Sequence, residues 1–411
     1  MLAPHGVAAG SSGTKGRFED AKGQRPFANS QGRSPCRAGD SSLTFGAAWA
    51  LRHIAAASPT SAALMSIPRL AAPALGLMLA MLPPLTQALT PDTAQRRDLE
   101  QAALQALERH YVLPERLQGL AQHLAAQRAP LDAAADGPAY AAQLGQLLSQ
   151  ATRDKHVRVL YSAEPLPTEL APTRGSPEQE RQMNRFINQG VFKVERLPGN
   201  LGYLDLRAFT EREQSRAKLD AAMALLADTE ALIIDLRANG GGRPDAVAYL
   251  SSYFFKERTH LNDMVWRTEK GEEVDAFHTE TVAFHYARPV WVLMSPRSVS
   301  AAEGFAYNLQ QQGRAQVAGQ TSMGAAHAGG MQRIGAHFSV FVPNGRSRNP
   351  KSGGNWEGVG VLPDLAVAAA DDALRVVQLR LLEGMKERSV DARLLRGLEA
   401  RIQALRDAAP P

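Results

Sequence analysis

The sequence has very little cysteine, because Cys36 is the only one among 411 residues. Since no cysteine follows it, the rest of the chain offers neither a disulfide framework nor a cysteine nucleophile. Long apolar runs are scarce too, and the run from 70 to 82 is too short for an ordinary membrane span. The composition, 44% hydrophobic and 21% charged, is that of a globular protein long enough for two domains.

The first 88 residues differ in kind from the rest. Residues 1–64 are rich in Gly, Ser, Ala and Arg without sustained periodicity, so we expect a disordered or mis-assigned upstream extension. Residues 65–88 have the parts of a secretory signal peptide: Arg69, the apolar run, and a small-residue cleavage site at 86–88. We therefore expect translation from Met65, a periplasmic or secreted protein, and no membrane span after signal removal. An uncleaved N-terminal membrane anchor is the alternative.

The net charge of +5 belongs to this leader. Residues 1–88 contain eight Lys or Arg and three Asp or Glu, so the remainder is close to neutral. A basic surface for nucleic acid should be a patch on the folded part. We therefore expect no nucleic-acid partner.

Hydrophobic periodicity divides the remainder into helical and α/β regions. Apolar positions three and four apart at 92–150 predict a helical bundle, whereas strand, helix and strand patterns between 202 and 237 predict a crossover with parallel pairing. Residues 261–280 resemble a hairpin, and residues 343–354 a polar loop. The expected domains are an N-terminal helical domain at 89–160, a linker at 161–189, an α/β domain at 190–370 and C-terminal helices at 371–411.

A serine lies where a strand gives way to a helix. The apolar run at 291–295 suits a buried strand, and a helical pattern begins at Ser300. The first amides of a helix lack partners within it, so the amide of Ala301 could hold an oxyanion beside Ser300. The alternative is structural, because Ser300 and Glu303 also form the S-x-x-E pattern of a capping box.

Two other stretches allow a chemical interpretation. Three glycines, 240–242, follow a buried strand, and glycine permits a backbone with positive φ that approaches a ligand closely. A plain tight turn is the alternative, and the phosphate-binding glycine patterns are absent here. His156 lies where a helical period changes to strand alternation, and its alternative role is that of a surface or half-buried polar residue.

Four stretches together resemble one family. They are DKHVRV around His156, LIIDLRANGGG at 232–242, SVSAAEGFAYNL at 298–309 and NWEGVGVLPDL at 355–365. The chain resembles the tricorn and C-terminal processing serine peptidases, and is most similar to the branch that includes the repeats of interphotoreceptor retinoid-binding protein. The resemblance implies an α/β fold class: a crotonase-like β/α core with an N-terminal helical bundle domain and C-terminal helices.

The resemblance also implies roles for residues. The family's nucleophile falls on Ser300, and its oxyanion donors fall on Ala301 and on the glycine turn, at Gly241 or Gly242. Peptidases of the Ser-Lys type carry a lysine base 25 residues after the serine, but this chain has Ala325 there. A Ser-Lys dyad at the usual place is therefore excluded.

The tricorn-like arrangement uses a histidine and a glutamate instead. Those roles fall on His156 as base and on Glu357, and imidazole is chemically suited to take the proton of a serine hydroxyl. Lys155 stands where tricorn has a serine before the histidine. His327, in a glycine-rich loop, is the alternative base.

These residues predict an exported serine endopeptidase that works through an acyl-enzyme, without metal or cofactor, on a peptide or protein substrate. The alternative is a non-catalytic module that binds an apolar small molecule resembling a retinoid or fatty acid. Survival of the serine, histidine, glutamate and glycine turn together favours the enzyme.

Overall fold

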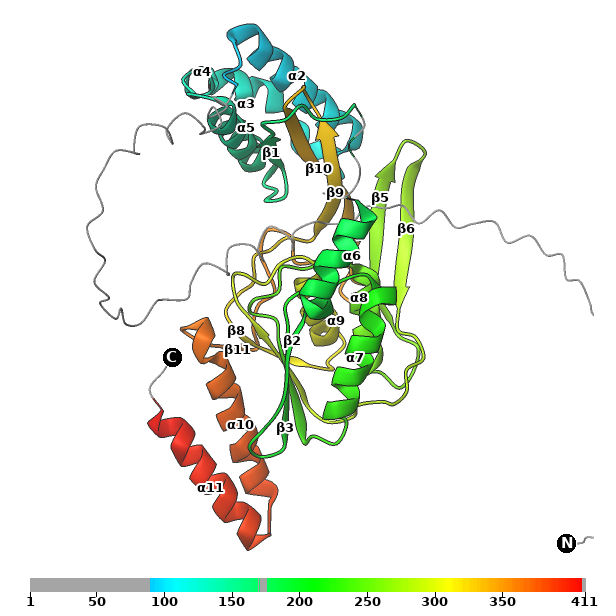
Figure 1. The fold of residues 1–411 in the computed structure, drawn as a ribbon, viewed down its shortest axis with the longest axis vertical. Coiled ribbons are helices and arrows are strands. Elements are labelled where there is room, and N and C mark those ends of the chain that lie inside the picture. Colours follow the sequence, from blue (N-terminus) through cyan, green and yellow to red (C-terminus); the bar gives the residue numbers. More distant parts are fainter. Residues whose placement is uncertain (1–88, 169, 171–175, 409–411) are drawn as a thin grey trace, which may run out of the picture. The chain divides into compact units, whose positions relative to one another are not determined.

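The computed structural model describes residues 89–168, 170 and 176–408, coloured along the chain in Figure 1. The extension expected at 1–64 and the signal peptide expected at 65–88 lie outside these residues. Within the described ranges, no helix combines the length and the apolar character that a bilayer span requires.

The α/β part is built on a six-stranded sheet with the strand order β11-β8-β7-β4-β3-β2. The strands, in chain order, are β2 (Val191–Leu197), β3 (Leu201–Leu206), β4 (Ala231–Asp235), β7 (Val290–Met294), β8 (Gln316–Gly319) and β11 (Leu365–Ala366). All neighbours pair in parallel except β2 and β3. The intervening helices are α7 (Arg212–Leu226), α8 (Pro244–Ser252) and α9 (Ala301–Gln311). This order confirms the crossover predicted between 202 and 237.

Both faces of this sheet are covered, as a parallel sheet requires. Successive side chains of a strand point to opposite faces, so Leu232 and Ile234 of β4 pack in the cluster with α7, α8 and α9. Ile233 packs instead with α10 (Ala373–Arg388) and α11 (Ala392–Asp407), which lie side by side in Figure 1. The predicted C-terminal helices and α/β fold class are confirmed.

A second sheet joins distant parts of the chain. Its strands are β1 (Arg158–Tyr161), β5 (His260–Thr268), β6 (Gly271–His278), β9 (His327–Arg333) and β10 (Phe338–Arg348), and β10 pairs with β1, β5 and β9. The β5–β6 hairpin confirms the prediction for 261–280. The polar loop predicted at 343–354 is wrong over residues 343–348, because β10 continues to Arg348 by pairing with β5, and it is confirmed over 349–354. A bulge between Pro343 and Gly345 accommodates the proline.

The N-terminal helices pack onto this second sheet. They are α2 (Thr93–His110), α3 (Leu120–Ala126), α4 (Arg128–Asp132) and α5 (Gly137–Thr152). Leu107 and Leu144 share a core with Val340 of β10, some 200 residues away along the chain. The helical bundle predicted at 92–150 is therefore present, and strands from the other end of the sequence complete its core.

The segment predicted as a linker at 161–189 contains a helix, α6 (Pro177–Phe186). The loop expected for this linker is therefore replaced by a helix over these ten residues. Ser176 and Gln179 form a capping box, and proline occupies the first turn, where its missing N–H costs nothing. The proline and the charged residues that resembled a loop are therefore helix-start signals.

Arg96 is a buried arginine that holds the N-terminal helices together. Its guanidinium donates to the carbonyls of Pro91, Leu131 and Ala134 at 2.7–2.8 Å, and also to Asp132. An Arg96→Ala variant should lower the free energy of unfolding by about 2–4 kcal/mol, because several buried carbonyls lose their donors. Urea unfolding would measure this loss. The neighbouring exposed Arg97→Ala is the matched control, and an equal effect of both substitutions would contradict the expectation.

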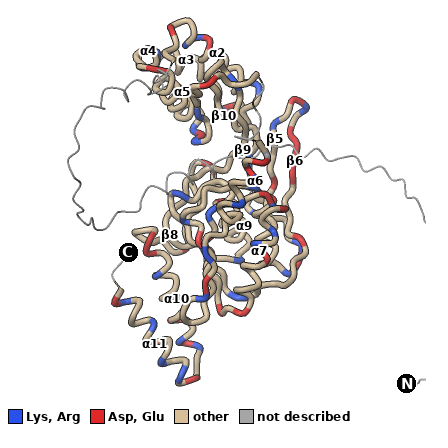
Figure 2. The backbone as a smooth tube through the Cα atoms, in the orientation of Figure 1, with Lys and Arg blue, Asp and Glu red and all other residues tan. Residues whose placement is uncertain are grey.

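Charges of both signs are interspersed over the described elements. Figure 2 shows blue and red segments alternating along the helices and strands. Ion pairs on the surface, such as Arg181 with Glu178 and Arg406 with Glu383, join them. Such exposed pairs contribute little stability each.

Candidate active site

Ser300 has a strained backbone at the junction of β7 and α9. Its φ of 57° and ψ of −114° lie in a region that non-glycine residues rarely adopt, and its side chain is buried. The preceding residue is fixed, because the N–H of Val299 donates to the carbonyl of Asn239 at 3.1 Å. A serine on a sharp strand-to-helix turn presents its hydroxyl away from the sheet, as nucleophilic serines do.

Glu303 fastens Ser300 to a neighbouring loop. One carboxylate oxygen accepts the N–H groups of Ser300 (2.7 Å) and Ala325 (3.0 Å). The other accepts the hydroxyl of Ser322 and the N–H of Gly324, both at 2.6 Å. Burial raises the pKa of Glu303 to about 7, although these four hydrogen bonds oppose the shift. The glutamate of the S-x-x-E pattern therefore accepts the Ser300 N–H, as in a capping box, and also positions the loop at 322–325.

Glu303→Gln tests this anchoring. The raised folded-state pKa contributes stability that is present below the ordinary value of 4.5 and lost as pH rises through about 7. The wild type should lose this component between about pH 5 and pH 8, and the variant should not. The variant should also be less stable at about pH 5, by about 1–3 kcal/mol, because its amide nitrogen cannot accept a hydrogen bond, whereas the hydroxyl oxygen of the neutral carboxyl still can. Urea unfolding at both pH values, with the exposed Glu387→Gln as control, would measure both effects, and equal pH slopes in the two proteins would contradict the expectation.

The glycine turn lies directly against Ser300. A Cβ added to Gly241 (φ 96°) would lie 2.8 Å from the carbonyl oxygen of Val299 and 3.0 Å from the Cβ of Ser300. The N–H of Gly241 donates to the side chain of Asn239 at 2.8 Å. Among the described residues, no backbone or side-chain acceptor takes the N–H groups of Gly242 and Ala301. Two free amides therefore flank the serine, and Gly242 is the better oxyanion donor of the two glycines.

Gly242→Ala is expected to destabilise the turn strongly. At φ 139° the added Cβ would lie 1.9 Å from the carbonyl oxygen of Phe209, so backbone must move. Strain and overpacking together should cost roughly 2–6 kcal/mol of unfolding free energy. Thermal and urea unfolding would show the loss. The matched control is Gly271→Ala, which also has positive φ (114°) but no atom within 4 Å of the added Cβ. A Gly242→Ala variant no less stable than this control would refute the steric argument.

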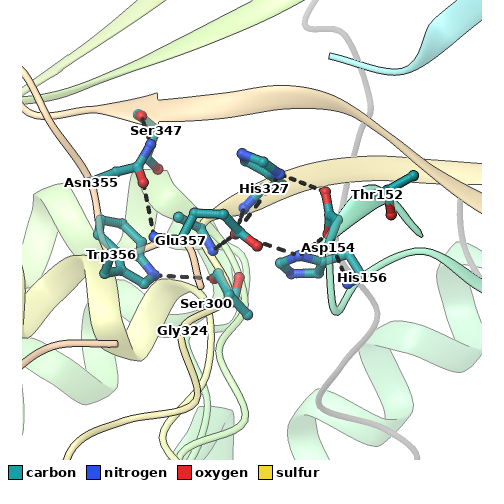
Figure 3. A network of polar contacts seen from close by, with 12 residues as sticks. Thr152, Asp154, His156, Ser300, Gly324, His327, Ser347, Asn355, Trp356 and Glu357 are labelled. Atoms are coloured by element: carbon teal, nitrogen blue, oxygen red, sulfur yellow. Dashed lines mark hydrogen bonds and ion pairs between the residues drawn. The ribbon is translucent and has the colours of Figure 1, made fainter. Parts of the chain in front are cut away.

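Two imidazoles and two carboxylates form a buried cluster beside this region. His327 Nδ1 lies 2.6 Å from an oxygen of Asp154 and 3.8 Å from Glu357 Oε2. His156 Nδ1 lies 3.5 Å from the other Asp154 oxygen and 4.0 Å from Glu357 Oε2. Figure 3 shows the His156 ring between Glu357 and Asp154, and the His327 ring separated from Ser300 by the Glu357 carboxylate. Both rings therefore share the Glu357 carboxylate, whose Oε2 lies 3.8–4.0 Å from Nδ1 of each.

Asp154 is the residue that the sequence patterns missed. It is fully buried, and it accepts the N–H of His156 (2.9 Å) and the hydroxyl of Tyr111 (3.1 Å) in addition to its contacts with both rings. Burial alone would raise the pKa of the Asp154 carboxyl, but hydrogen bonds from the His156 and His327 rings hold it below its usual range. The sequence did carry one signal for Asp154. A carboxylate two residues before a histidine can accept a hydrogen bond from the backbone N–H of that histidine.

The loop at 322–327 connects the serine to this cluster. Its Ala325 amide binds Glu303, and the next two amides, of Ala326 (2.6 Å) and His327 (3.2 Å), donate to Glu357 Oε2. The side chain of Lys155 donates to the carbonyl of Met323 at 2.6 Å. Consecutive residues thus contact the carboxylate beside Ser300 and the one beside the histidines. Lys155 therefore contacts the same loop as Glu303 and Glu357.

The structure thus brings Ser300, the glycine turn, Glu357 and both histidines to one region. Chemically, the arrangement offers a hydroxyl, two unpaired amides and imidazoles oriented by carboxylates, which suits acyl transfer. The ligand atoms of Asp154, His327 and Glu357 also lie within 4.8 Å of one another, close enough to hold one metal ion.

Comparison with known proteins agrees with the resemblance drawn from the four stretches. Residues 200–367 match Peptidase family S41. The chain is 28% identical over 196 residues to a carboxy-terminal-processing protease of Bartonella bacilliformis, covering 46% of this chain and 44% of that protein. It is 24% identical over 225 residues to a protein described as "Probable CtpA-like serine protease" of Staphylococcus haemolyticus, covering 53% and 43%. The matched part therefore spans less than half the length of these relatives.

Among solved structures, the photosystem II D1 C-terminal processing protease aligns with a TM-score of 0.42 and 16% identity, over 67% of this chain and 94% of that one. The family matches confirm the resemblance to the C-terminal processing peptidases. The narrower likeness to the retinoid-binding repeats stays a prediction. His156 and Asp154 lie outside the matched region, whereas Ser300, Glu357 and the glycine turn lie within it.

Proposed function

We propose that this chain, which matches Peptidase family S41 over residues 200–367, is a serine peptidase that cleaves peptide bonds through an acyl-enzyme. Ser300 is the nucleophile, His156 the base and Glu357 the supporting carboxylate. The observation that carries the proposal is the strained backbone of Ser300 between two amides without acceptors, those of Gly242 and Ala301. A serine that only caps a helix would need neither a strained backbone nor amides without acceptors beside it.

The reaction follows from these positions. Nδ1 of His156 faces both carboxylates, so Nε2 takes the hydroxyl proton of Ser300 as its oxygen attacks the carbonyl carbon of the substrate. The negative charge that develops on the carbonyl oxygen is received by the N–H groups of Gly242 and Ala301. The protonated imidazole is stabilised by Asp154 and Glu357, and it then gives its proton to the leaving amine. Water repeats the sequence on the ester and releases the acid.

The substrate in this proposal is a peptide or protein chain that lies extended, with its scissile carbonyl at the two amides. Ser300 and the His156 cluster are buried in the structure, so the substrate enters by displacing covering side chains or loops. The enzyme acts after export, in a periplasm or outside the cell, and it needs no metal or cofactor for the chemistry.

A fluorophosphonate probe tests the proposal directly. The folded protein should form one adduct, and mass spectrometry of a digest should place it on Ser300. Heat-denatured protein is the control and should not react. Absence of an adduct, or an adduct shared among several serines, would refute the nucleophile assignment.

The same preparation tests the non-catalytic alternative. An apolar-ligand carrier would retain a fluorescent fatty acid through gel filtration and would leave the probe unreacted. The peptidase should show the reverse.

A further inference from the structure

The buried cluster of two imidazoles and two carboxylates has the composition of a metal-binding site. Asp154 and His156 come from the turn after α5, His327 begins β9, and Glu357 follows β10. Imidazole nitrogen and carboxylate oxygen are the ligands that Zn²⁺ accepts in four-coordinate sites. The proposed peptidase chemistry uses His156 and both carboxylates, but it assigns no step to His327.

The spacing of three of these ligand atoms suits one ion, because those of Asp154, His327 and Glu357 all lie within 4.8 Å of one another. Tetrahedral Zn²⁺ with bonds of 2.0–2.2 Å places its ligand atoms about 3.3–3.6 Å apart. His327 Nδ1 lies 3.8 Å from Glu357 Oε2, close to that separation. Its distance of 2.6 Å from Asp154 is a hydrogen bond, which must lengthen when a metal replaces the proton.

Unmet bonding capacity at Glu357 is an independent sign of a missing partner. Its Oε1 is buried and has no hydrogen-bond partner among the described residues, and the side chain is only 6% exposed. A buried carboxylate oxygen without a donor is costly. Its other oxygen is fixed by the amides of Ala326 and His327, so the side chain is already oriented for a ligand.

We propose that Asp154, His327 and Glu357 supply three ligands of a Zn²⁺ site that reversibly inhibits the enzyme. Zn²⁺ binds Nδ1 of His327 in place of its proton, the neutral ring then carries its one proton on Nε2, and no electron is transferred. Both carboxylates are then bound to the ion, so the imidazolium that His156 becomes on accepting the proton of Ser300 loses the negative charges that stabilise it. The ion is thus an inhibitor and takes no part in the chemistry. The inhibitory half of this inference rests on the proposed function, whereas the binding half does not.

Metal binding is tested on the full chain without any activity measurement. Titration with Zn²⁺ should show one ion per chain and a higher melting temperature, and Co²⁺ should give the visible bands of a tetrahedral site. His327→Ala and Glu357→Gln should each weaken binding at least about tenfold, since even the loss of an outer partner costs that much. The matched control is His260→Ala, whose histidine also pairs with an aspartate, Asp263, at 2.7 Å and should leave binding unchanged. Melting curves without metal show that each variant is folded.

The fluorophosphonate reaction distinguishes metal binding from inhibition of the proposed peptidase. Zn²⁺ should slow labelling of Ser300 at least about tenfold in proportion to site occupancy, and a chelator should restore it. The absence of metal binding, or equal affinity in wild type, His327→Ala and Glu357→Gln, would overturn the site while labelling upholds the proposed function. If the protein binds Zn²⁺ but Ser300 never reacts with the fluorophosphonate, the proposed function and the inhibition are refuted, whereas the metal site is supported.

Discussion

Ser300→Ala is expected to lower kcat for peptide hydrolysis by about 10⁴–10⁶-fold, with little change in the melting temperature. In the proposed mechanism the hydroxyl oxygen forms the covalent bond, so no neighbouring group can replace it. Residual activity above the uncatalysed rate should remain, because the amides of Gly242 and Ala301 still receive the oxyanion. Steady-state hydrolysis of an unstructured protein substrate would measure the loss.

The control for this change is Ser298→Ala, two residues away. Ser298 is buried as well, and its hydroxyl donates to the carbonyl of Leu236 at 2.7 Å. Its loss should cost about 1 kcal/mol of stability and leave kcat nearly unchanged. If both variants lose activity together, the effect is structural and Ser300 is not the nucleophile.

His156→Ala should lower kcat by about 10²–10⁴-fold, the contribution of a general base. Since the serine and its base act as a unit, the double variant with Ser300→Ala should be no slower than Ser300→Ala alone. His327→Ala should cost less, because its Nδ1 is held by Asp154 and Figure 3 places Glu357 between its ring and the serine. Kinetics of the three variants would decide between the histidines. A larger loss for His327→Ala would reverse the assignment of the base.

Periodicity predicted the elements whose partners are close in sequence. The crossover from β3 to β4 and the β5–β6 hairpin follow from local patterns, because each strand shows which face is apolar. The length of β10 could not be predicted, since its last residues are ordered by pairing with β5, which lies some 80 residues earlier. Long-range pairing overrode the polar, proline-containing sequence at that point.

The residues of the candidate site also fall into two groups, those with a local sequence signal and those whose role depends on distant contacts. Ser300 and the glycine turn carry local signals, namely a strand-to-helix junction and three glycines. The pairing of His156 with Glu357 came from the family resemblance alone. Asp154 was missed because its role depends on His327, which is 173 residues away in sequence. Glu303 was interpreted as a capping residue, since the loop that supplies three of its four donors follows it by 19–22 residues.

The segment after the N-terminal helices contacts the region matched by the peptidase family, because Lys155 donates to the Met323 carbonyl. The proposed proton acceptor belongs to the segment that follows the N-terminal helices, and the nucleophile belongs to the region matched by the peptidase family. A shortened protein starting at residue 200 would keep the attacking oxygen but lose the group that activates it. Recombinant work on such a shortened protein would then record an inert protein, although every residue of the family match had been kept.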